Sequence, residues 1–431
     1  MLGAILTTAW SDIRATRYSW FAVAVTLTAA GAATAYSLAF LIDGEQGAAE
    51  VGGTLLGLAL IGTVSATTSV TGLVVNERRR AYARWKLVGM SGVAAFTVVM
   101  AQVLTVTMVA VLPGALLAFP LVPWAADYFA VQGAPLGDPE VGLDVIVIAV
   151  VVCMGAVVLG SLGKVLAVSR VRPVVALRTA VAPTARPGIL ATGWSLMMTV
   201  ALVMFLTSDD IHEDGAVLGV QVIVLLTVVP VTGWLVLVLL HWTRLLHVFG
   251  PSARVAAGGS RIRSAFTNAQ VLPWFLLAGL IVGIGSPMMV MVRADGAELT
   301  GAELLVPMLA PALIPPLAAG ISSILVLVPR MRTDARVLLR AGAGRRHLLG
   351  VIGWDSLVVV VTAGMLTLAV TVPGVAVANA VCRGEPWPPG WWTDILWLPF
   401  GAIAAAMWLL MSAVSCLVRP TSPGRGWSQL P

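Results

Sequence analysis

The sequence predicts an all-α integral membrane protein with about ten transmembrane helices. Of its 431 residues, 59% are hydrophobic and 11% are charged, whereas soluble globular chains carry about 25% charged residues. The hydrophobic residues gather in runs of about 20, the length that an α-helix needs to cross a bilayer. The expected spans are 19–42, 53–76, 94–119, 144–168, 189–207, 216–240, 270–292, 303–328, 349–380 and 393–418.

Three segments add detail to this prediction. Residues 1–18 mix apolar side chains with Asp12 and two arginines. This pattern predicts an amphipathic helix on the membrane surface and not a cleavable signal peptide. The span 94–119 ends in a proline-rich stretch, and the span 349–380 is long enough to tilt or kink.

The basic residues predict the orientation. If the N-terminus is cytoplasmic and the spans alternate, every one of the 26 Lys and Arg residues except Arg293 and Arg383 falls on the inner side. Basic residues in short loops favour the cytoplasmic side of a membrane, so we expect both termini to be cytoplasmic in a bacterial plasma membrane. The formal charge of +6 then follows from membrane topology, and we expect no nucleic-acid partner.

Two long basic loops suggest an internal repeat. A shift of 253 positions aligns residues 76–102 with residues 329–355, so that Gly89 meets Gly342 and Gln102 meets Asp355. Each loop follows a span, carries a basic stretch and a glycine, and enters another long span. The chain therefore divides into a four-span unit (1–180), two linking spans (181–252) and a second four-span unit (253–431).

Each basic loop is expected to form a short helix parallel to the membrane. In the first loop Tyr82, Trp85 and Val88 recur at helical spacing, with arginines between them. One interpretation is simple topology, in which the loops contact anionic lipid headgroups. The other is a partner with two matched docking sites. The candidate docking residues are Glu77, Arg78, Arg79, Arg80, Arg84, Lys86, Gly89, Arg332, Arg336, Arg340, Gly342, Arg345 and Arg346.

The first loop resembles the coupling-helix segment of FtsX-like permeases of ABC transporters. It reads E-R-R-R-x-x-x-x-x-K-x-x-G-x-S from Glu77 to Ser91, and the stretch 338–346 is similar to the same consensus. The stretch 172–178 also resembles the P-x-x-A-L-R ending of the family. The arrangement of four, two and four spans is similar to the bacitracin-exporter type. The outer loops 43–52 and 293–302 are too short for the large outer domains of related permeases.

ATP hydrolysis is expected to reside in another polypeptide. The only lysines are Lys86 and Lys164, and neither lies in a G-x-x-x-x-G-K-[ST] phosphate-binding loop. We expect no catalytic residues, no metal site and no cofactor in this chain. The family resemblance implies two copies of a separate ABC ATPase, which would bind the ATP and Mg²⁺.

Polar residues and prolines within the spans form a further group of candidates. Placing the polar side chains of Gln102 and Asp355 in lipid costs free energy. Either an interhelical hydrogen bond or a proton relay would account for Asp355. Pro311 and Pro315 remove backbone donors in the eighth span, which predicts either a gate or a static bend.

These observations predict the membrane (permease) subunit of an ATP-driven exporter or extractor. Its substrate would be a hydrophobic or amphipathic compound such as a peptide, lipid or drug, and antimicrobial resistance would be one outcome. Two alternatives stay open. The first is a mechanotransmitting permease that activates an extracellular partner without transport. The second is a secondary transporter without an ATPase, which the basic inner loops disfavour.

Overall fold

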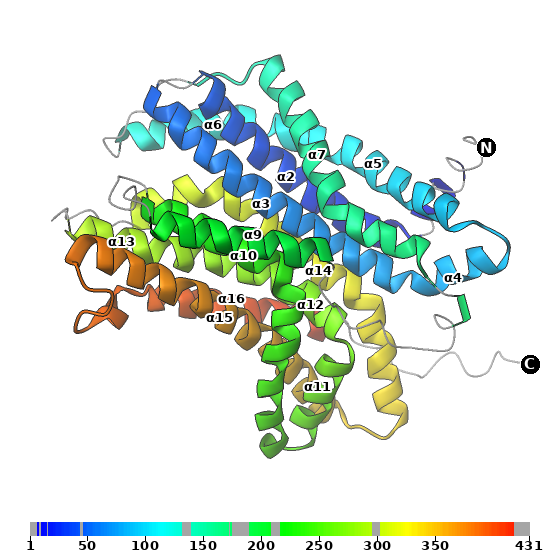
Figure 1. The fold of residues 1–431 in the computed structure, drawn as a ribbon. Coiled ribbons are helices and arrows are strands. Elements are labelled where there is room, and N and C mark those ends of the chain that lie inside the picture. The colour runs from blue at the N-terminus through cyan, green and yellow to red at the C-terminus, as the bar shows by residue number, and fades with distance from the viewer. Residues whose placement is uncertain are drawn as a thin grey trace, which may run out of the picture.

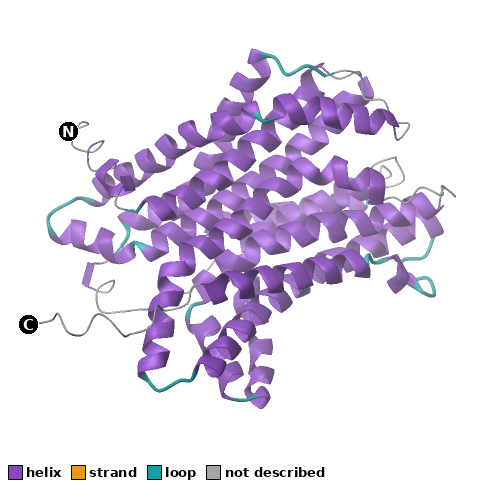
Figure 2. Ribbon diagram, turned by 180° about the vertical axis from the view of Figure 1, so that it is seen from behind, coloured by secondary structure: helices purple, strands orange, loops and turns teal. Residues whose placement is uncertain are grey.

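The computed structural model describes residues 7, 10–14, 16–43, 46–131, 139–171, 173–174, 189–207, 216–294 and 302–417. Every regular element in these residues is a helix, and most helices run side by side along one direction (Figures 1 and 2). Nine helical stretches of the described chain are long and apolar enough to cross a membrane. The prediction of an all-α multi-pass membrane protein is confirmed.

The N-terminal half contains four long helices that pack tightly. They are α2 (Arg17–Asp43), α3 (Gln46–Glu77), α5 (Gly92–Leu116) and α7 (Leu143–Ser169). The helices α2 and α5 approach closely at Gly31. A Cβ atom at this position would lie only 2.5 Å from the Val111 carbonyl oxygen, so there is no room for a larger side chain. Small residues allow such contacts, which stabilise helix association inside a bilayer.

Two shorter helices complete this half. The helix α4 (Arg79–Leu87) follows α3 almost directly, and α6 (Ala118–Val131) continues the line of α5. The predicted span 94–119 therefore ends too early, because the apolar helical stretch reaches Val131. The proline-rich segment does not stop it. Pro120 lies in the first turn of α6, where a missing backbone N–H costs little.

The linking segment contains α9 (Ile189–Leu206) and α10 (Ala216–Leu239), followed by the 3₁₀-helix η2 (Leu240–Phe249) and α11 (Pro251–Ile262). The predicted span 189–207 corresponds to α9. Within it the apolar helix over Thr192–Leu206 is shorter than the nine spans above.

The C-terminal half begins with one long apolar stretch, Ser264–Ala294. It consists of α12 (Ser264–Ala278), the π-helical turn η3 (Gly279–Ile284) and α13 (Gly285–Ala294). The remaining long helices are α14 (Ala302–Arg340), α15 (Arg345–Arg383) and α16 (Trp397–Leu417).

The two halves pack against each other along their long helices. The helix α14 packs against α2 and α3, and α12 packs against α3. Hydroxyl groups join these helices: Thr26 donates to the Ser322 hydroxyl at 3.1 Å, and Ser69 donates to the carbonyl oxygen of Ala269. Buried side chains from both halves meet in one of the hydrophobic clusters.

Two features of α14 differ from expectation. The helix continues through Pro311 and Pro315 without a break. It also continues to Arg340, so the second basic loop does not form a separate short helix, and that prediction is wrong. In the first half Arg78 leaves the α conformation (φ −92°, ψ 4°) where its side chain turns to Asp12. The aligned position holds Met331, which continues the helix.

Candidate functional site

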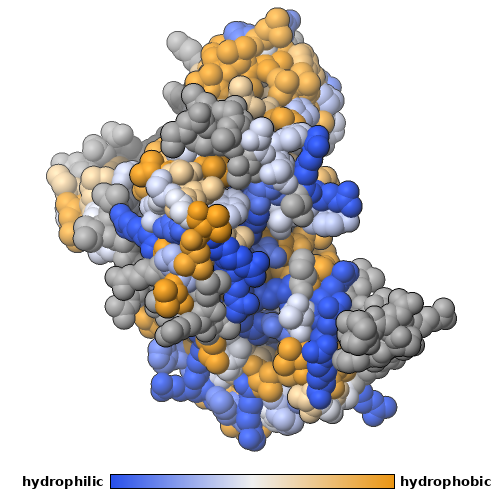
Figure 3. Space-filling model, turned by 90° about the vertical axis from the view of Figure 1, so that its right-hand side faces the viewer, coloured by the Kyte–Doolittle hydropathy of each residue, from blue (hydrophilic) through white to orange (hydrophobic). Residues whose placement is uncertain are grey.

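Two basic helix ends lie at the same end of the molecule. We name residues 79–89 the first basic segment and residues 330–342 the second basic segment. The first consists of α4 and its C-terminal turn, and the second is the last part of α14 with its turn. Figure 1 shows both toward its right-hand side, and Figure 3 shows hydrophilic side chains spread over that end.

The turns that end the two segments have the same hydrogen bonds. In the first, the amide of Gly89 donates to the Lys86 carbonyl, and the amide of Met90 donates to the Trp85 carbonyl. In the second, the amides of Gly342 and Ala343 donate to carbonyls in the same relative positions, 253 residues further along. This is the Schellman pattern, in which a residue in the left-handed region ends the helix.

The glycines are required by this backbone geometry. Gly89 has φ +100° and Gly342 has φ +87°, values that other L-residues rarely adopt. The next helix then begins at the same relative place, because the N-cap residues Ser91 (φ −68°, ψ 157°) and Gly344 (φ −71°, ψ 161°) share one conformation. The alignment made from sequence thus matches the backbone residue by residue across this turn.

Exposed arginines form a stripe on each segment. Arg80 and Arg84 are exposed on α4, one turn apart, and Val88 continues the line with 90% of its surface exposed. The second stripe has the same spacing of four residues, and its members are Arg332, Arg336 and Arg340. An exposed apolar side chain, Val337, lies beside it. Each segment therefore presents positive charge next to an apolar contact.

Three predicted docking residues make contacts inside the protein, at or beside α4. Arg78 is 9% exposed and forms a two-pronged ion pair with Asp12. Glu77 accepts a hydrogen bond from Ser19 at 3.5 Å. Lys86 donates to the carbonyl oxygens of Ser169 (2.6 Å) and Val171, and a cation is favourable at the C-terminal end of a helix such as α7. The contacts of these three residues are therefore internal.

The remaining candidates differ in exposure. Arg79 is half-buried and Arg346 is exposed. Arg345 is the first residue of α15. Tyr82 is fully buried and packs against Trp85, with ring centroids 5.3 Å apart. The apolar face predicted for this helix is therefore only partly right, because Val88 faces outward.

Electrostatic interactions stabilise the charged form of Arg78 in its ion pair with Asp12. Burial alone would lower the pKa of Arg78, but the hydrogen bond to Asp12 and the nearby acidic groups hold that pKa above its ordinary value. Burial also raises the pKa of the Tyr82 hydroxyl. Gln102 donates to Asp12 at 2.7 Å. This network joins the N-terminal segment, the start of α4 and α5.

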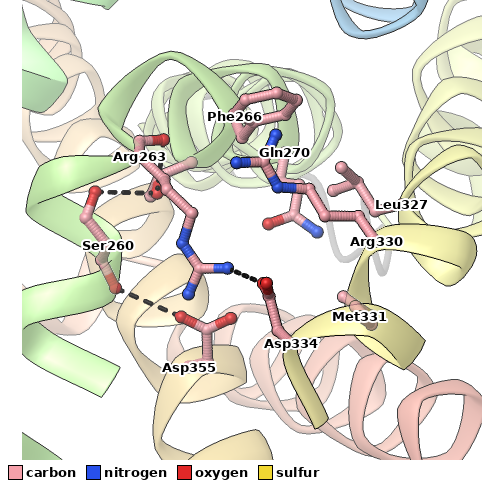
Figure 4. Close-up of a pocket in the computed structure, with 10 residues that line it drawn as sticks. Ser260, Arg263, Phe266, Gln270, Leu327, Arg330, Met331, Asp334 and Asp355 are labelled. Carbon is pink, nitrogen blue, oxygen red and sulfur yellow. Dashed lines mark hydrogen bonds and ion pairs between the residues drawn. The ribbon is translucent and has the colours of Figure 1, made fainter. Parts of the chain in front are cut away.

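The second half contains a related network with the charges exchanged. Arg263, beside the C-terminus of α11, pairs with Asp334 on the second basic segment, and Ser260 donates to Asp355 at 3.2 Å (Figure 4). Asp355 therefore makes the interhelical hydrogen bond that its sequence position suggested. The guanidinium of Arg330 lies 4.0 Å from the centre of the Phe266 ring.

These side chains surround a cavity of about 40 Å³, which has room for about two or three water molecules. Burial lowers the pKa of Arg330. The ion pair here is more exposed than the one in the first half, with 34% of Arg263 and 45% of Asp334 exposed. The ion pair on the second basic segment is thus less buried than the one at the start of the first.

The two basic residues that the charge pattern placed outside share one partner. Asp394 is 3% exposed, and its two carboxylate oxygens accept from Arg293 (2.8 Å) and Arg383 (3.0 Å). These contacts join the ends of α13 and α15 to the segment before α16. Both cations that the charge pattern assigned to the outer side therefore bind one buried carboxylate.

Several of these contacts were not predicted from the sequence. Asp12 was assigned only to a surface helix, and Asp334, Arg263 and Asp394 were given no role. Only the alignment of Gln102 with Asp355 pointed toward the two networks.

Comparison with known families gives one match. The family described as FtsX-like permease C-terminal matches residues 53–173. The match runs from α3 through α7 and includes the first basic segment, while the second basic segment lies beyond it. No curated protein matches the chain.

Proposed function

Because residues 53–173 form an FtsX-like permease domain, a type that generally serves as the membrane component of ABC transporters, we propose that this chain is the membrane subunit of an ATP-driven exporter or extractor. A separate ATPase binds and hydrolyses ATP with Mg²⁺. It docks on the two basic segments, and its closure moves them together. The helices that continue from each segment carry this motion into the membrane.

The observation that carries the proposal is the presence of an exposed arginine stripe on each basic segment. Each stripe ends in the same glycine turn and is followed at once by a long helix, α5 or α15. We propose that this short hydrogen-bonded turn carries the displacement from the docking surface to the membrane helix. Arginine suits such a surface because its guanidinium pairs with carboxylates in a fixed geometry.

The short outer loops expected from the sequence and the apolar helices support a proposal for the substrate class. We propose a hydrophobic or amphipathic compound that reaches the protein from the bilayer. The exposed apolar residues of α5, α6 and α7 offer lipid-facing surfaces along which such a compound could enter. Export of a toxic amphipathic compound would confer resistance to it.

Charge reversal at the exposed stripes tests the docking surface. The variants Arg80→Glu with Arg84→Glu, and Arg332→Glu with Arg336→Glu, are purified in detergent with the co-expressed ATPase. We expect each pair to weaken co-purification and ATPase stimulation, and the four changes together to abolish both. Arg17→Glu, an exposed arginine on α2, is the matched control and should change neither. An ATPase that stays bound to the fourfold variant would contradict the proposal.

Stoichiometry tests the pairing of the two segments. One chain presents both segments, so we propose one copy of this chain with two copies of the ATPase. The ion pairs at the two segments differ in burial, which predicts that variants in one impair stimulation more than variants in the other. Native mass spectrometry of the detergent-solubilised complex measures the ratio. Two copies of this chain per ATPase dimer would refute the assignment.

A further inference from the structure

The 3₁₀-helix η2 has an unusual length and an unusual sequence pattern. It runs for ten residues, whereas 3₁₀-helices longer than about four residues are uncommon. Because a 3₁₀-helix has three residues per turn, residues three apart share a face. The sequence of η2 follows this period of three from Leu240 to Val248.

The first of its three faces is buried against α11. This face consists of Leu240, Thr243 and Leu246. Two arginines of α11 bind η2: Arg261 donates to the Thr243 side-chain hydroxyl at 2.9 Å, and Arg254 donates to the His247 backbone carbonyl at 3.1 Å. The two helices thus form one hairpin, which we name the η2–α11 hairpin.

The other two faces have opposite chemistry. One is polar and basic, and its members His241, Arg244 and His247 are all exposed. The last face is apolar, and its members are Trp242, Leu245 and Val248. Trp242 is partly buried and anchored to Thr362 at 3.2 Å, while Leu245 is 68% exposed and Val248 is 86% exposed. Phe249 adds a further exposed apolar side chain.

The hairpin lies where a membrane surface is expected. At 1.5 Å per residue, the 24 residues of α10 measure about 36 Å, which exceeds the ~30 Å hydrocarbon core. The apolar stretch Gly219–Phe249 runs on through η2, but α10 alone is long enough for that span. Figures 1 and 2 show the hairpin lying across the direction of the long helices. A segment in this position runs along the plane of the bilayer.

From these observations we propose that the η2–α11 hairpin is an anionic-lipid binding surface at the basic end of the molecule. The face of Leu245 and Val248 enters the acyl region, and the adjacent face of Arg244 contacts the phosphates of anionic headgroups. Side chains of this kind bind membrane interfaces through buried apolar area together with charge attraction. The proposal is independent of ATPase docking.

Lipid quenching tests the position of the apolar face. Cys153, Cys382 and Cys416 are replaced by Ala, and Val248→Cys is labelled with an environment-sensitive fluorophore in nanodiscs. Val88→Cys is the matched control, because Val88 is 90% exposed but lies on α4. We expect brominated acyl chains to quench the label at 248 and aqueous iodide to quench the label at 88. A label at 248 that iodide reaches and bromolipid does not would overturn the proposal.

Headgroup selectivity tests the basic face. At equal mole fraction, brominated phosphatidylglycerol should quench the label at 248 more than brominated phosphatidylcholine, with an enrichment of up to about fivefold for one cation near the surface. Arg244→Gln should reduce this preference. Equal quenching by both lipids in the unaltered Arg244 background refutes anionic-lipid binding. Protection from iodide that appears only when the ATPase is added would show a protein-docking surface instead.

Discussion

Gln102 and Asp355 make equivalent connections in the two halves of the protein. Each lies on the helix that follows a basic segment, and each bonds to the segment that precedes the first long helix of its half. Gln102 donates to Asp12, and Asp355 accepts from Ser260. The contact therefore links a proposed docking surface to the segment that precedes the first long helix of the same half. Movement of either basic segment would therefore also displace the segment that contains Asp12 or Ser260.

The ion pair between Arg78 and Asp12 should matter more than the pair between Arg263 and Asp334. Arg78→Gln leaves a largely buried carboxylate without its cation, and loss of one partner in a buried pair costs about 3–5 kcal/mol of stability. Arg263→Gln is the matched control, because an exposed pair contributes about 0–1 kcal/mol. Denaturation in mild detergent measures both free energies of unfolding.

Asp12→Asn tests whether the stability lost in Arg78→Gln comes from the unpaired carboxylate. Combined with Arg78→Gln, it should recover part of the stability that the single change removes, since no unpaired charge then remains. Equal losses for Arg78→Gln and Arg263→Gln would contradict the difference in burial between the two pairs.

The glycine turns should be sensitive to a single methyl group. Gly89→Ala and Gly342→Ala force an alanine into the left-handed region, which costs about 1–2 kcal/mol. Gly163→Ala is the matched control: this glycine lies inside α7, and a Cβ there would meet nothing within 4 Å. That change should stabilise the protein by about 0.5–1 kcal/mol.

Hydrogen exchange adds a local measurement to the glycine series. Faster exchange at the amides that close each turn should accompany the loss of stability at positions 89 and 342. Unchanged exchange in both variants would show that the turns do not depend on glycine.

Removal of the buried Asp394 carboxylate should loosen α13, α15 and the segment before α16 together. Asp394→Asn leaves Arg293 and Arg383 without their anionic partner, and hydrogen bonds to charged groups contribute about 1.5–3 kcal/mol each. Arg293→Gln leaves one ion pair in place, so it should cost less. Limited proteolysis and thermal unfolding compare the two variants, and a larger effect for Arg293→Gln would argue against a shared clamp.

Hydropathy and spacing sufficed for the fold class because a membrane helix must be long and apolar, and both properties are local. The turn at Gly89 and Gly342 could be aligned for the same reason, since its backbone geometry demands glycine. The docking residues were harder to predict, because an arginine next to a membrane can either pair with an acidic residue inside the protein or stay exposed for a partner. Arg78 and Arg80 are two positions apart, yet one is buried against Asp12 and the other is exposed.

The extent of α14 also depended on tertiary contacts. Met331 stands at the position of Arg78 in the aligned part of α14, and the helix breaks only where Arg78 pairs with an acidic residue 66 positions earlier. The role of Asp394 is similar, because its two partners come from different helices. Sequence periodicity cannot predict such pairs, because it describes one continuous segment and these partners lie on different segments.

The orientation predicted from charge can be tested with cysteine labelling. Cys382 is partly exposed next to Arg383, and Ser91 and Gly344 lie at the turns after the basic segments. Both turn positions have extended backbone conformations, which cysteine adopts without strain. With Cys153 and Cys416 replaced by Ala, an impermeant maleimide should label Cys382 in sealed cells. In backgrounds that also lack Cys382, Ser91→Cys and Gly344→Cys should react only after the membrane is permeabilised, because the basic residues beside them favour the cytoplasm. Labelling of Ser91→Cys in sealed cells would reverse the topology and place the proposed docking surfaces outside, where no ATPase could reach them.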